Sequence, residues 1–267
     1  MTASVTFIGT ATTLLRLGDF TILTDPNFLH VGEPAYLGYG LWSRRRTNPA
    51  LDFEQLPPLD GVLLSHLHGD HFDRIASKSI PSALPIITTP QASRQLLRRG
   101  FTAAVPLSTW HSEVWQRGTH VLRVTSVPAQ HGPAVVHRAL PETMGSIVDL
   151  DEHGVRTLRL YITGDTLYRQ RLAEIARRFP DIDAILLHLG GTRILGVLLT
   201  MDGQQGAELL STFPTGVALP VHYDDYPVFR SPLTDFLAAA NASGFEERVR
   251  LLPKGEAVPL VGGEQRV

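Results

Sequence analysis

One short segment constrains this chain more than any other: a dense group of ligand-type side chains that directly follows an apolar run. Residues 61–65 have the composition of a buried strand. The next six residues contain three histidines and one aspartate, namely His66, His68, Asp70 and His71. A lone histidine is more often a core or surface residue, but imidazole and carboxylate groups at this density suit zinc, iron or manganese. The chain is therefore expected to fold around a metal site at the end of this strand.

Further ligands are needed, because a six-residue motif cannot complete two coordination spheres. A tight loop that leads into a helix turns successive side chains in different directions, so the first two histidines are expected at one metal. The following aspartate and histidine are expected at another. Candidates for the remaining positions come after apolar, strand-like runs and before loops, and they are His131, Asp165 and His222. We expect them at strand ends along the same sheet edge as the histidine cluster.

The order of apolar runs predicts strands at the start of each half and alternating strands and helices towards its end. Residues 5–9, 12–17 and 20–24 are prone to form strands, with a two-residue turn at Gly18 and Asp19. Helical spacing or helix signals occur, each near a strand-like run, at residues 91–99, 169–179, 202–213 and 231–240. We expect an α/β protein in which two mixed β-sheets pack together with helices outside, as a single domain over residues 1–267.

A long polar excursion, residues 25–58, separates the first strands from the histidine cluster. It is rich in proline, glycine and arginine and is too long for an ordinary connection, which indicates a functional loop region. Four apolar side chains in it could cover the site as a lid or contact another protein: Tyr36, Tyr39, Leu41 and Trp42. The arginine run 44–46 would suit a phosphate or carboxylate substrate, although such a run is more often a solvated face or a subunit contact.

The order of the candidate ligands resembles that of the metallo-β-lactamase superfamily. The pattern His-x-His-x-Asp-His, followed in turn by His, Asp and His, extends over nearly the whole chain. The resemblance implies a four-layer αββα sandwich of two mixed β-sheets flanked by helices. It also implies the ligand sets, which are His66, His68 and His131 for one metal, Asp70, His71 and His222 for the second, and Asp165 as a bridge between them.

Three shorter segments resemble a narrower branch of that superfamily. They are residues 6–9, residues 23–26 and residues 200–202. The branch includes ascorbate phosphate lactonases and N-acyl-phosphatidylethanolamine-hydrolysing phospholipase D. Its members usually carry histidine after the first-strand glycine and often tryptophan after the last histidine ligand, where this chain has Thr10 and Tyr223.

The expected function is that of a dinuclear metal-dependent hydrolase. Two cations about 3.5–4 Å apart can hold a shared water and lower its pKa, so a metal-bridging hydroxide would attack a small ester, lactone or phosphodiester. Asp70 is expected to orient that hydroxide. His188, near the end of a strand-like run, could protonate a leaving group or hydrogen-bond the substrate, or it could simply cap its strand. Two divalent ions are expected, with zinc as the first choice and manganese or iron as alternatives for the same nitrogen and oxygen ligands.

Other residues are assigned supporting or binding roles. Asp25 is expected to accept a hydrogen bond from a ligand histidine and fix its tautomer, with a turn-starting role before Pro26 as the alternative. Contact with the substrate is expected from Arg45, Arg193 and Tyr223. Asp202 and Gln205 form a capping-box pattern at a helix start, so a structural role is expected there.

Composition excludes several classes of site. The chain has no cysteine, which rules out disulfides, thiolate zinc sites and a cysteine nucleophile. Its 24 Lys and Arg against 26 Asp and Glu give a formal charge of -2, so no overall field attracts nucleic acid or an anionic membrane. Two alternatives to the small-molecule hydrolase therefore rank below it: a nuclease acting on RNA or DNA, and a metal-stabilised binding module without activity.

The apolar runs also bear on location. None approaches the roughly 18 residues of a membrane span, and the apolar stretch near the start follows no basic region. We expect a cytoplasmic protein that acts on a small molecule, with no nucleic-acid partner. A homo-oligomer is compatible with the sequence, and the arginine and aromatic excursion is where a subunit contact would be sought.

Overall fold

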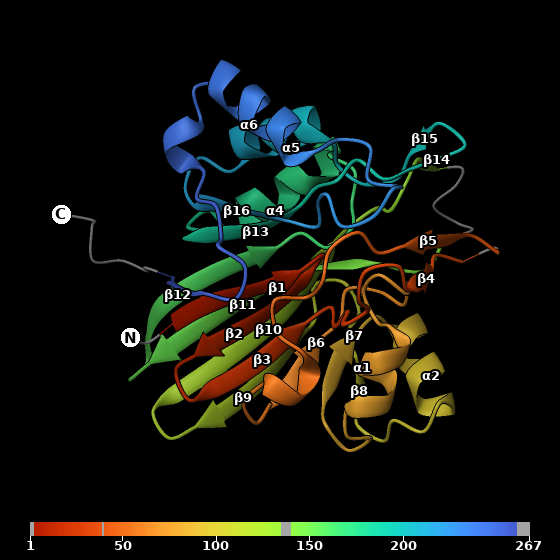
Figure 1. Cartoon of the computed structure of the whole chain (residues 1–267). Helices are drawn as coiled ribbons and strands as arrows, with labels where there is room; N and C mark the ends of the chain where they lie inside the picture. Colours follow the sequence, from red (N-terminus) through yellow and green to blue (C-terminus); the bar gives the residue numbers. More distant parts are fainter. Residues whose placement is uncertain (1–2, 39, 135–139, 261–267) are drawn as a thin grey trace.

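The computed structural model contains two β-sheets packed face to face, with helices on their outer sides (Figure 1). It describes residues 3–38, 40–134 and 140–260. Within these ranges the larger sheet has seven strands in the order β17-β1-β2-β3-β6-β7-β8, and the second has six in the order β16-β13-β12-β11-β10-β9. The predicted four-layer αββα class is confirmed.

The seven-stranded sheet draws on both ends of the described chain. Its strands are β1 (Ala3–Gly9), β2 (Thr12–Leu17), β3 (Phe20–Thr24), β6 (Gly61–Leu63), β7 (Ile86–Thr88), β8 (Ala104–Pro106) and β17 (Ala257–Pro259). The first three form the expected antiparallel meander. Strand β3 pairs in parallel with β6, so the residues that follow each strand, Asp25 and the histidine cluster, reach the same sheet edge.

The six-stranded sheet brings the other candidate ligands to one edge. Its strands are β9 (Ser112–Arg117), β10 (His120–Pro128), β11 (Met144–Glu152), β12 (Val155–Ile162), β13 (Ala184–His188) and β16 (Val217–Val221). Strands β12, β13 and β16 are parallel, and β10 runs in their direction because both β10 and β12 are antiparallel to β11. The carboxyl ends of these four strands therefore point the same way, which is where ligands bind in sheets of this kind.

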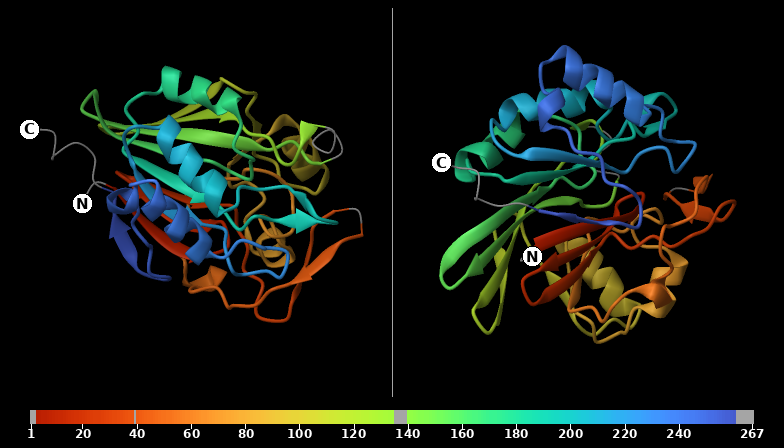
Figure 2. Two further views of the ribbon diagram at one scale, coloured as in Figure 1. Left: turned by 90° about the horizontal axis from the view of Figure 1, so that it is seen from above. Right: turned by 60° about the vertical axis from the view of Figure 1, so that its left-hand side comes forward.

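Helices cover the outer faces of both sheets (Figure 2). The seven-stranded sheet carries α1 (Arg74–Ser79) and α2 (Pro90–Arg98), and the six-stranded sheet carries α4 (Ala173–Arg178), α5 (Gly203–Thr212) and α6 (Leu233–Ala242). The described residues also form three short 3-10 turns: η1 (Phe53–Gln55), η2 (Gln170–Leu172) and η3 (Glu246–Arg248). Asp202 caps α5 by accepting from the backbone N–H of Gln205 at 3.1 Å, as its position predicted.

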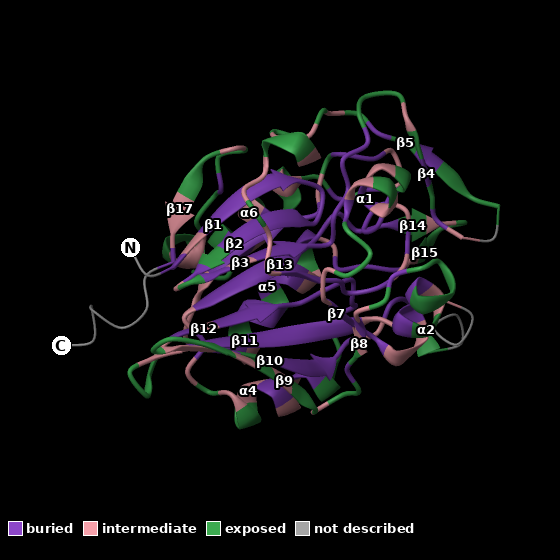
Figure 3. Cartoon of the chain, turned by 90° about the horizontal axis from the view of Figure 1, so that it is seen from below, coloured by how far each residue is buried: buried purple, intermediate pink, exposed green. Residues whose placement is uncertain are grey.

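The main core lies between the two sheets, and Figure 3 shows their strands as largely buried. Successive side chains of β13 pack on opposite faces of the sheet. Leu186 points into the core between the sheets, whereas Ile185 and Leu187 pack under the helices with Leu209 and Phe236. Such strands are apolar on both faces, which explains why they read as continuous apolar runs in the sequence.

The structure departs from the sequence expectation in its short elements. The helix expected at residues 169–179 is divided into η2 and α4. Strands β9 and β17 and helix α1 were not predicted. Two short hairpins were also missed: β4 (Pro34–Tyr36) with β5 (Trp42–Arg44), which lies in the long excursion, and β14 (Arg193–Ile194) with β15 (Val197–Leu198). Their strands are too short to show a period of two. No helix within the described ranges has the length and apolar character needed to cross a bilayer.

Candidate metal centre

The predicted ligands meet in two groups of three at the shared edge. In each group, one ligand atom from every residue lies within 4.8 Å of the others. The first group consists of His66, His68 and His131, and the second consists of Asp70, His71 and His222. All six side chains are buried. The sequence brings them together from β6, β10 and β16, because each follows the carboxyl end of its strand.

Asp165 lies between these two groups. It forms a third such set with His66 and His71, one member from each group. Its Oδ2 is 3.3 Å from Nε2 of His71 and 4.0 Å from Nε2 of His131, and its Oδ1 is 3.6 Å from Nε2 of His222. A single carboxylate that reaches both groups is placed to bridge two cations.

The rings of the outer histidines are oriented by backbone carbonyls. Nδ1 of His131 lies 3.1 Å from the carbonyl oxygen of Leu199, and Nδ1 of His222 lies 3.1 Å from that of Leu189. A carbonyl only accepts, so Nδ1 carries the proton in each case. The lone pair of each Nε2 therefore faces the cluster, as a metal ligand requires.

Asp25 lies behind His71, on the side away from the cluster. Its Oδ2 is 3.3 Å from Nδ1 of His71, and its Oδ1 accepts from the backbone N–H of Ser65 at 2.7 Å and from the Ser65 hydroxyl at 3.0 Å. Burial raises the pKa of the Asp25 carboxyl, but the charge of His71 and hydrogen bonds from His188 and His71 outweigh it and lower the pKa to about 2. Asp25 is thus a buried anion.

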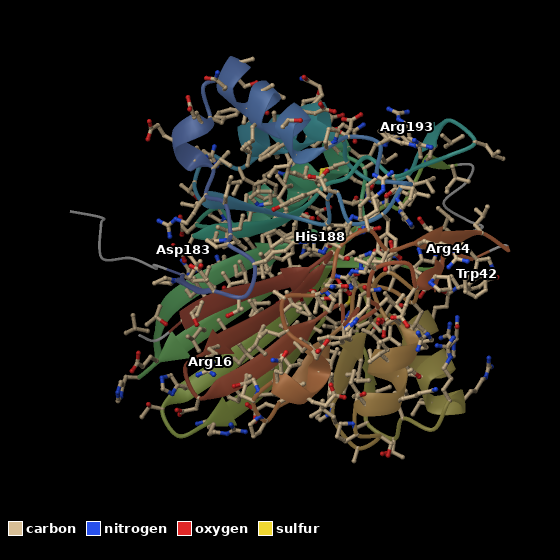
Figure 4. All side chains as sticks on the ribbon, in the orientation of Figure 1. Arg16, Trp42, Arg44, Asp183, His188 and Arg193 are labelled. Atoms are coloured by element: carbon tan, nitrogen blue, oxygen red, sulfur yellow. The ribbon has the colours of Figure 1, made fainter. Side chains whose placement is uncertain are left out.

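His188 contacts Asp25 rather than the open part of the site. Its Nε2 is 3.5 Å from Oδ2 of Asp25, and its Nδ1 is 3.3 Å from the hydroxyl of Thr163. Figure 4 shows it deep between the two layers, and its ring is 1% exposed. A general acid must reach the leaving group, so the structure does not provide the access that the acid role assigned to His188 requires.

Backbone strain gathers around the same edge. Asp25, His222 and Thr10 have φ values of 37°, 61° and 51°, in the left-handed region that non-glycine residues seldom adopt. The backbone N–H of His222 donates to the carbonyl of Thr10 at 2.5 Å, and the N–H of Thr10 donates to Oδ2 of the buried Asp225 at 2.5 Å. Such strain persists only where the surroundings fix the backbone, and it is typical of functional sites.

Gly69 allows the histidine cluster to pack under the β4–β5 hairpin. Its N–H donates to the carbonyl of Tyr36 at 2.8 Å. A Cβ at this position would lie 2.7 Å from the backbone nitrogen and oxygen of Tyr36. Because backbone cannot give way as a flexible side chain can, only glycine fits between His68 and Asp70 here.

The charges and unpaired atoms of the cluster fit cations. Burial lowers the pKa of His66, and neighbouring imidazoles lower it further. Burial also lowers the pKa of His71, but the carboxylates of Asp165 and Asp25 outweigh it and hold that pKa well above its ordinary value. Among the described candidate ligands, Asp70 Oδ1, Asp165 Oδ1 and His68 Nε2 are buried and have no hydrogen-bond partner. Buried polar atoms are normally paired, so unpaired atoms at these positions fit a site that holds metal ions and a water molecule.

A cavity of about 450 Å³ opens beside the cluster. His68, Asp70, His131 and Asp165 form its polar floor. The rest of its described lining is Leu37, Leu41, Leu140, Thr192, Ile194, Leu195, Val197 and Leu199. These residues come mainly from the β4–β5 and β14–β15 hairpins, which both views of Figure 2 place at the same end of the molecule.

The three residues expected to contact substrate lie elsewhere. Arg45 is buried, with 2% exposed, and donates to the backbone carbonyl of Asn27 at 2.9 Å. Arg193 points away from the cavity (Figure 4), and its guanidinium is 3.5 Å from Asp202. Tyr223 packs on Phe7, with ring centroids 5.9 Å apart. None of the three lines the cavity, so the structure does not bring them to the site.

The expected lid is only partly formed by the side chains assigned to it. Leu41 lines the cavity. Tyr36 and Trp42 pack against each other, with ring centroids 4.9 Å apart and planes tilted by 51°, and do not line it. Tyr39 lies outside the described residues. Leu37, in the turn between β4 and β5, contributes to the cavity wall although the sequence did not single it out.

Two sheets with a cluster of histidines and aspartates at their common edge define a protein of the metallo-β-lactamase fold. The Beta-lactamase superfamily domain matches residues 21–223, and the chain belongs to this superfamily. The family resemblance inferred from the ligand order is confirmed. The match begins in β3 and ends directly after the last predicted ligand, His222.

Relatives with similar sequences and folds extend over most of the chain. A metal-dependent hydrolase of Archaeoglobus fulgidus is 29% identical over 264 residues, which is 95% of this chain and 97% of the relative. The isothiocyanate hydrolase from Delia radicum gut bacteria has a similar structure, with a TM-score of 0.80 at 19% identity over 97% of this chain and all of the other. A metallo hydrolase of Ignicoccus hospitalis matches with a TM-score of 0.71 at 19% identity, over 97% of this chain and 98% of the other. The solved structures support the fold.

Proposed function

We propose that the chain is a metal-dependent hydrolase that holds two divalent metal ions and acts on a small ester, lactone or phosphodiester. The observation that carries this proposal is the position of Asp165 between two complete groups of buried ligands. The names of the sequence relatives, which are metal-dependent hydrolases, support it. Zinc suits the nitrogen and oxygen ligands best, and manganese or iron would be accepted by the same groups.

Each ligand group would bind one of the two metal ions. His66, His68 and His131 would hold one ion, and Asp70, His71 and His222 the other. When bound, the two ions would supply Lewis acidity and lower the pKa of a water molecule towards neutrality. The protein would fix the spacing of the two ions through Asp165 and keep the imidazole rings in one tautomer through the backbone carbonyls behind them.

Asp70 is the residue best placed to handle a proton. It lies on the cavity floor, where its Oδ1 has no hydrogen-bond partner among the described side chains. Its Oδ2 is 3.5 Å from Nε2 of His222. An attacking water in the cavity would donate to the free oxygen, so Asp70 would orient the water and accept its proton while it serves as a ligand.

Asp25 and His188 would act through His71. The negative charge of Asp25 favours the proton on Nδ1 of His71 and so keeps its Nε2 directed at the second group. Nε2 of His188 lies 3.5 Å from Oδ2 of Asp25, the same oxygen that His71 contacts. We therefore assign His188 a positioning role in place of the acid role.

Removing only the charge of Asp25 tests this arrangement. Asp25→Asn is expected to weaken zinc binding by roughly 10–100-fold, because the partner that fixes His71 becomes neutral. Asparagine tolerates the left-handed backbone, so the φ of 37° at this position is kept. The measurement is a zinc titration against a chromophoric chelator, with the melting temperature recorded for each variant.

Asp60 offers a matched control at the other end of the same strands. It also accepts from a backbone N–H, that of Thr21 at 2.8 Å, but lies far from the cluster. Asp60→Asn should leave the zinc affinity unchanged. Equal loss of affinity in both variants would show that Asp25 acts only through general stability.

The proposed function as a whole is tested by metal content and turnover together. Elemental analysis of the purified protein is expected to give two metal ions per chain. Ester, lactone and phosphodiester substrates are each assayed with zinc and with manganese. At least one should be hydrolysed, and a chelator should inhibit its hydrolysis. Well under one metal ion per chain, together with hydrolysis that a chelator does not change, would contradict the proposal.

A further inference from the structure

The cavity beside the ligands is apolar except for its floor. Above His68, Asp70, His131 and Asp165, its described wall has only one polar side chain, Thr192. The other wall residues are aliphatic: Leu37, Leu41, Leu140, Ile194, Leu195, Val197 and Leu199. A concave site with apolar walls and a small polar end is typical of small-molecule binding. Its polar end marks where the reacting group lies, and its walls mark what the remainder of the ligand must resemble.

Several of these aliphatic side chains are open to solvent in the free protein. Leu195, at the turn of the β14–β15 hairpin, is 99% exposed, and Leu41 and Val197 are 38% and 37% exposed. Leu195 is held there with a φ of 48°, a left-handed conformation that costs energy at a bulky residue. Exposed aliphatic groups that surround a cavity are covered when an apolar ligand enters, which makes its binding favourable.

The nearby arginines are engaged by the protein itself. Arg193 is 3.5 Å from Asp202 and donates to the carbonyl of Gly196 at 3.3 Å. Arg44 donates to the carbonyl of Gly32 at 2.7 Å. The described lining of the cavity contains no arginine or lysine, so these described walls offer an anionic substrate no cationic side chain.

Resting on the hydrolase function proposed above, we propose that the substrate is a neutral carboxylic ester or lactone with an aliphatic group. The carbonyl would lie at the polar floor, where bound cations would polarise it, and the aliphatic group would lie between the β4–β5 and β14–β15 hairpins. Water would add its oxygen to the acyl carbon, the bond from that carbon to the ester oxygen would break, and the leaving oxygen would take a proton. The products are a carboxylic acid and an alcohol from an ester, or a single hydroxy acid from a lactone, and no other reactant is needed.

Binding can be measured without turnover, with alkyl hydroxamates as probes. Acetohydroxamate, butyrohydroxamate and hexanohydroxamate share one metal-binding group and differ only in methylenes. Titration of the zinc-loaded protein by calorimetry is expected to show affinity rising about twofold to fourfold per methylene, the range for partial to full burial of each group. Affinity that is the same across the series would overturn the proposal.

Charged substitutions in the β14–β15 hairpin test whether this hairpin binds the alkyl chain. Val197→Asp and Leu195→Asp should each reduce the affinity for hexanohydroxamate by about tenfold and leave that for acetohydroxamate within about twofold, since burying a carboxylate beside hydrocarbon is costly. The exposed position of Leu195 ensures that its variant folds. Val155→Asp is the matched control. Val155 is also an exposed valine of a β-hairpin, but it lies at the start of β12, whereas the candidate ligands follow the carboxyl ends of the strands. An equal loss in the control would contradict the assignment.

Turnover separates this proposal from the function on which it rests. The p-nitrophenyl esters of acetate, butyrate and hexanoate should show kcat/KM rising with chain length, and bis(p-nitrophenyl) phosphate should be turned over more slowly than the hexanoate. Metal-dependent hydrolysis with no chain-length preference, or with preference for the phosphodiester, would overturn the substrate class and leave the hydrolase function intact. Chain-length-dependent binding without any metal-dependent hydrolysis would support the apolar site and contradict the hydrolase function.

Discussion

Asp165→Asn is expected to lower kcat/KM for the best substrate by on the order of 10³-fold or more. Asp165 reaches both ligand groups, with Oδ2 4.0 Å from Nε2 of His131 in the first group and 3.3 Å from Nε2 of His71 in the second. An asparagine keeps the size of the side chain but presents one neutral oxygen in place of two charged ones. It therefore cannot balance two cations, and bound metal should fall from two ions per chain to one or fewer. Elemental analysis and steady-state kinetics measure the two effects.

A second buried aspartate provides the control for that variant. Asp149 on β11 is nearly as buried as Asp165, but it pairs with Arg159, whose Nε lies 2.6 Å from its Oδ1. Asp149→Asn should lower stability and leave the metal content and kcat/KM of the folded protein unchanged. If Asp165→Asn also keeps two metal ions and full activity, Asp165 does not bridge the ions and the two-metal mechanism is wrong.

The grouping of the predicted ligands at one edge was foreseeable from the direction of the strands. His66, His131 and His222 each follow an apolar run, and parallel strands bring such positions to one edge. The sequence shows both the runs and the ligand types. The sequence does not show how the strands are aligned within each sheet. That alignment is not needed for this prediction, because parallel strands bring their carboxyl ends to the same edge whatever their exact register.

The burial of the Arg45 side chain could have been predicted from the alternation of exposed and buried side chains along a strand. Residues 42–45 alternate exposed, buried, exposed and buried, so Arg44 faces solvent and Arg45 faces the interior. An arginine is rarely buried, and this one is accommodated by Asn27, whose backbone and side-chain oxygens both accept from it. The charge suggested an anion site, but the strand period was the better guide to where the side chain lies.

The apolar wall could not be predicted, because its elements have unusual turn chemistry. The β14–β15 hairpin turns at Leu195 and Gly196, with φ values of 48° and 81°. Such two-residue turns normally carry asparagine or aspartate before the glycine, so a leucine there gives no hairpin signal. The role of Asp225 was missed for another reason. Residues 224 and 225 are both aspartate, and only the fold shows that Asp225 is the buried one, next to Thr10.

Removal of the metal ions is expected to lower the apparent melting temperature by roughly 10–20 °C and to abolish hydrolysis. A ligand that binds only the folded state adds about 4 kcal/mol of stability per site at a free concentration 1,000 times its dissociation constant. Two sites would add about 8 kcal/mol, and a chain of this length gains roughly 1.5–2 °C per kcal/mol. The measurement is thermal unfolding and turnover of the chelated protein, before and after zinc is restored.

The size of that shift also reports whether the two groups act together. Asp70, Asp165 and Asp25 place three buried carboxylates within one cluster, and without cations these carboxylates raise the pKa of His71 and His222. Filling both groups replaces that arrangement, so Asp165→Asn should show about half the shift of the parent protein, and Asp149→Asn the whole of it. A melting temperature that zinc does not raise, in a protein that was fully stripped of metal, would mean that the buried cluster is complete without cations.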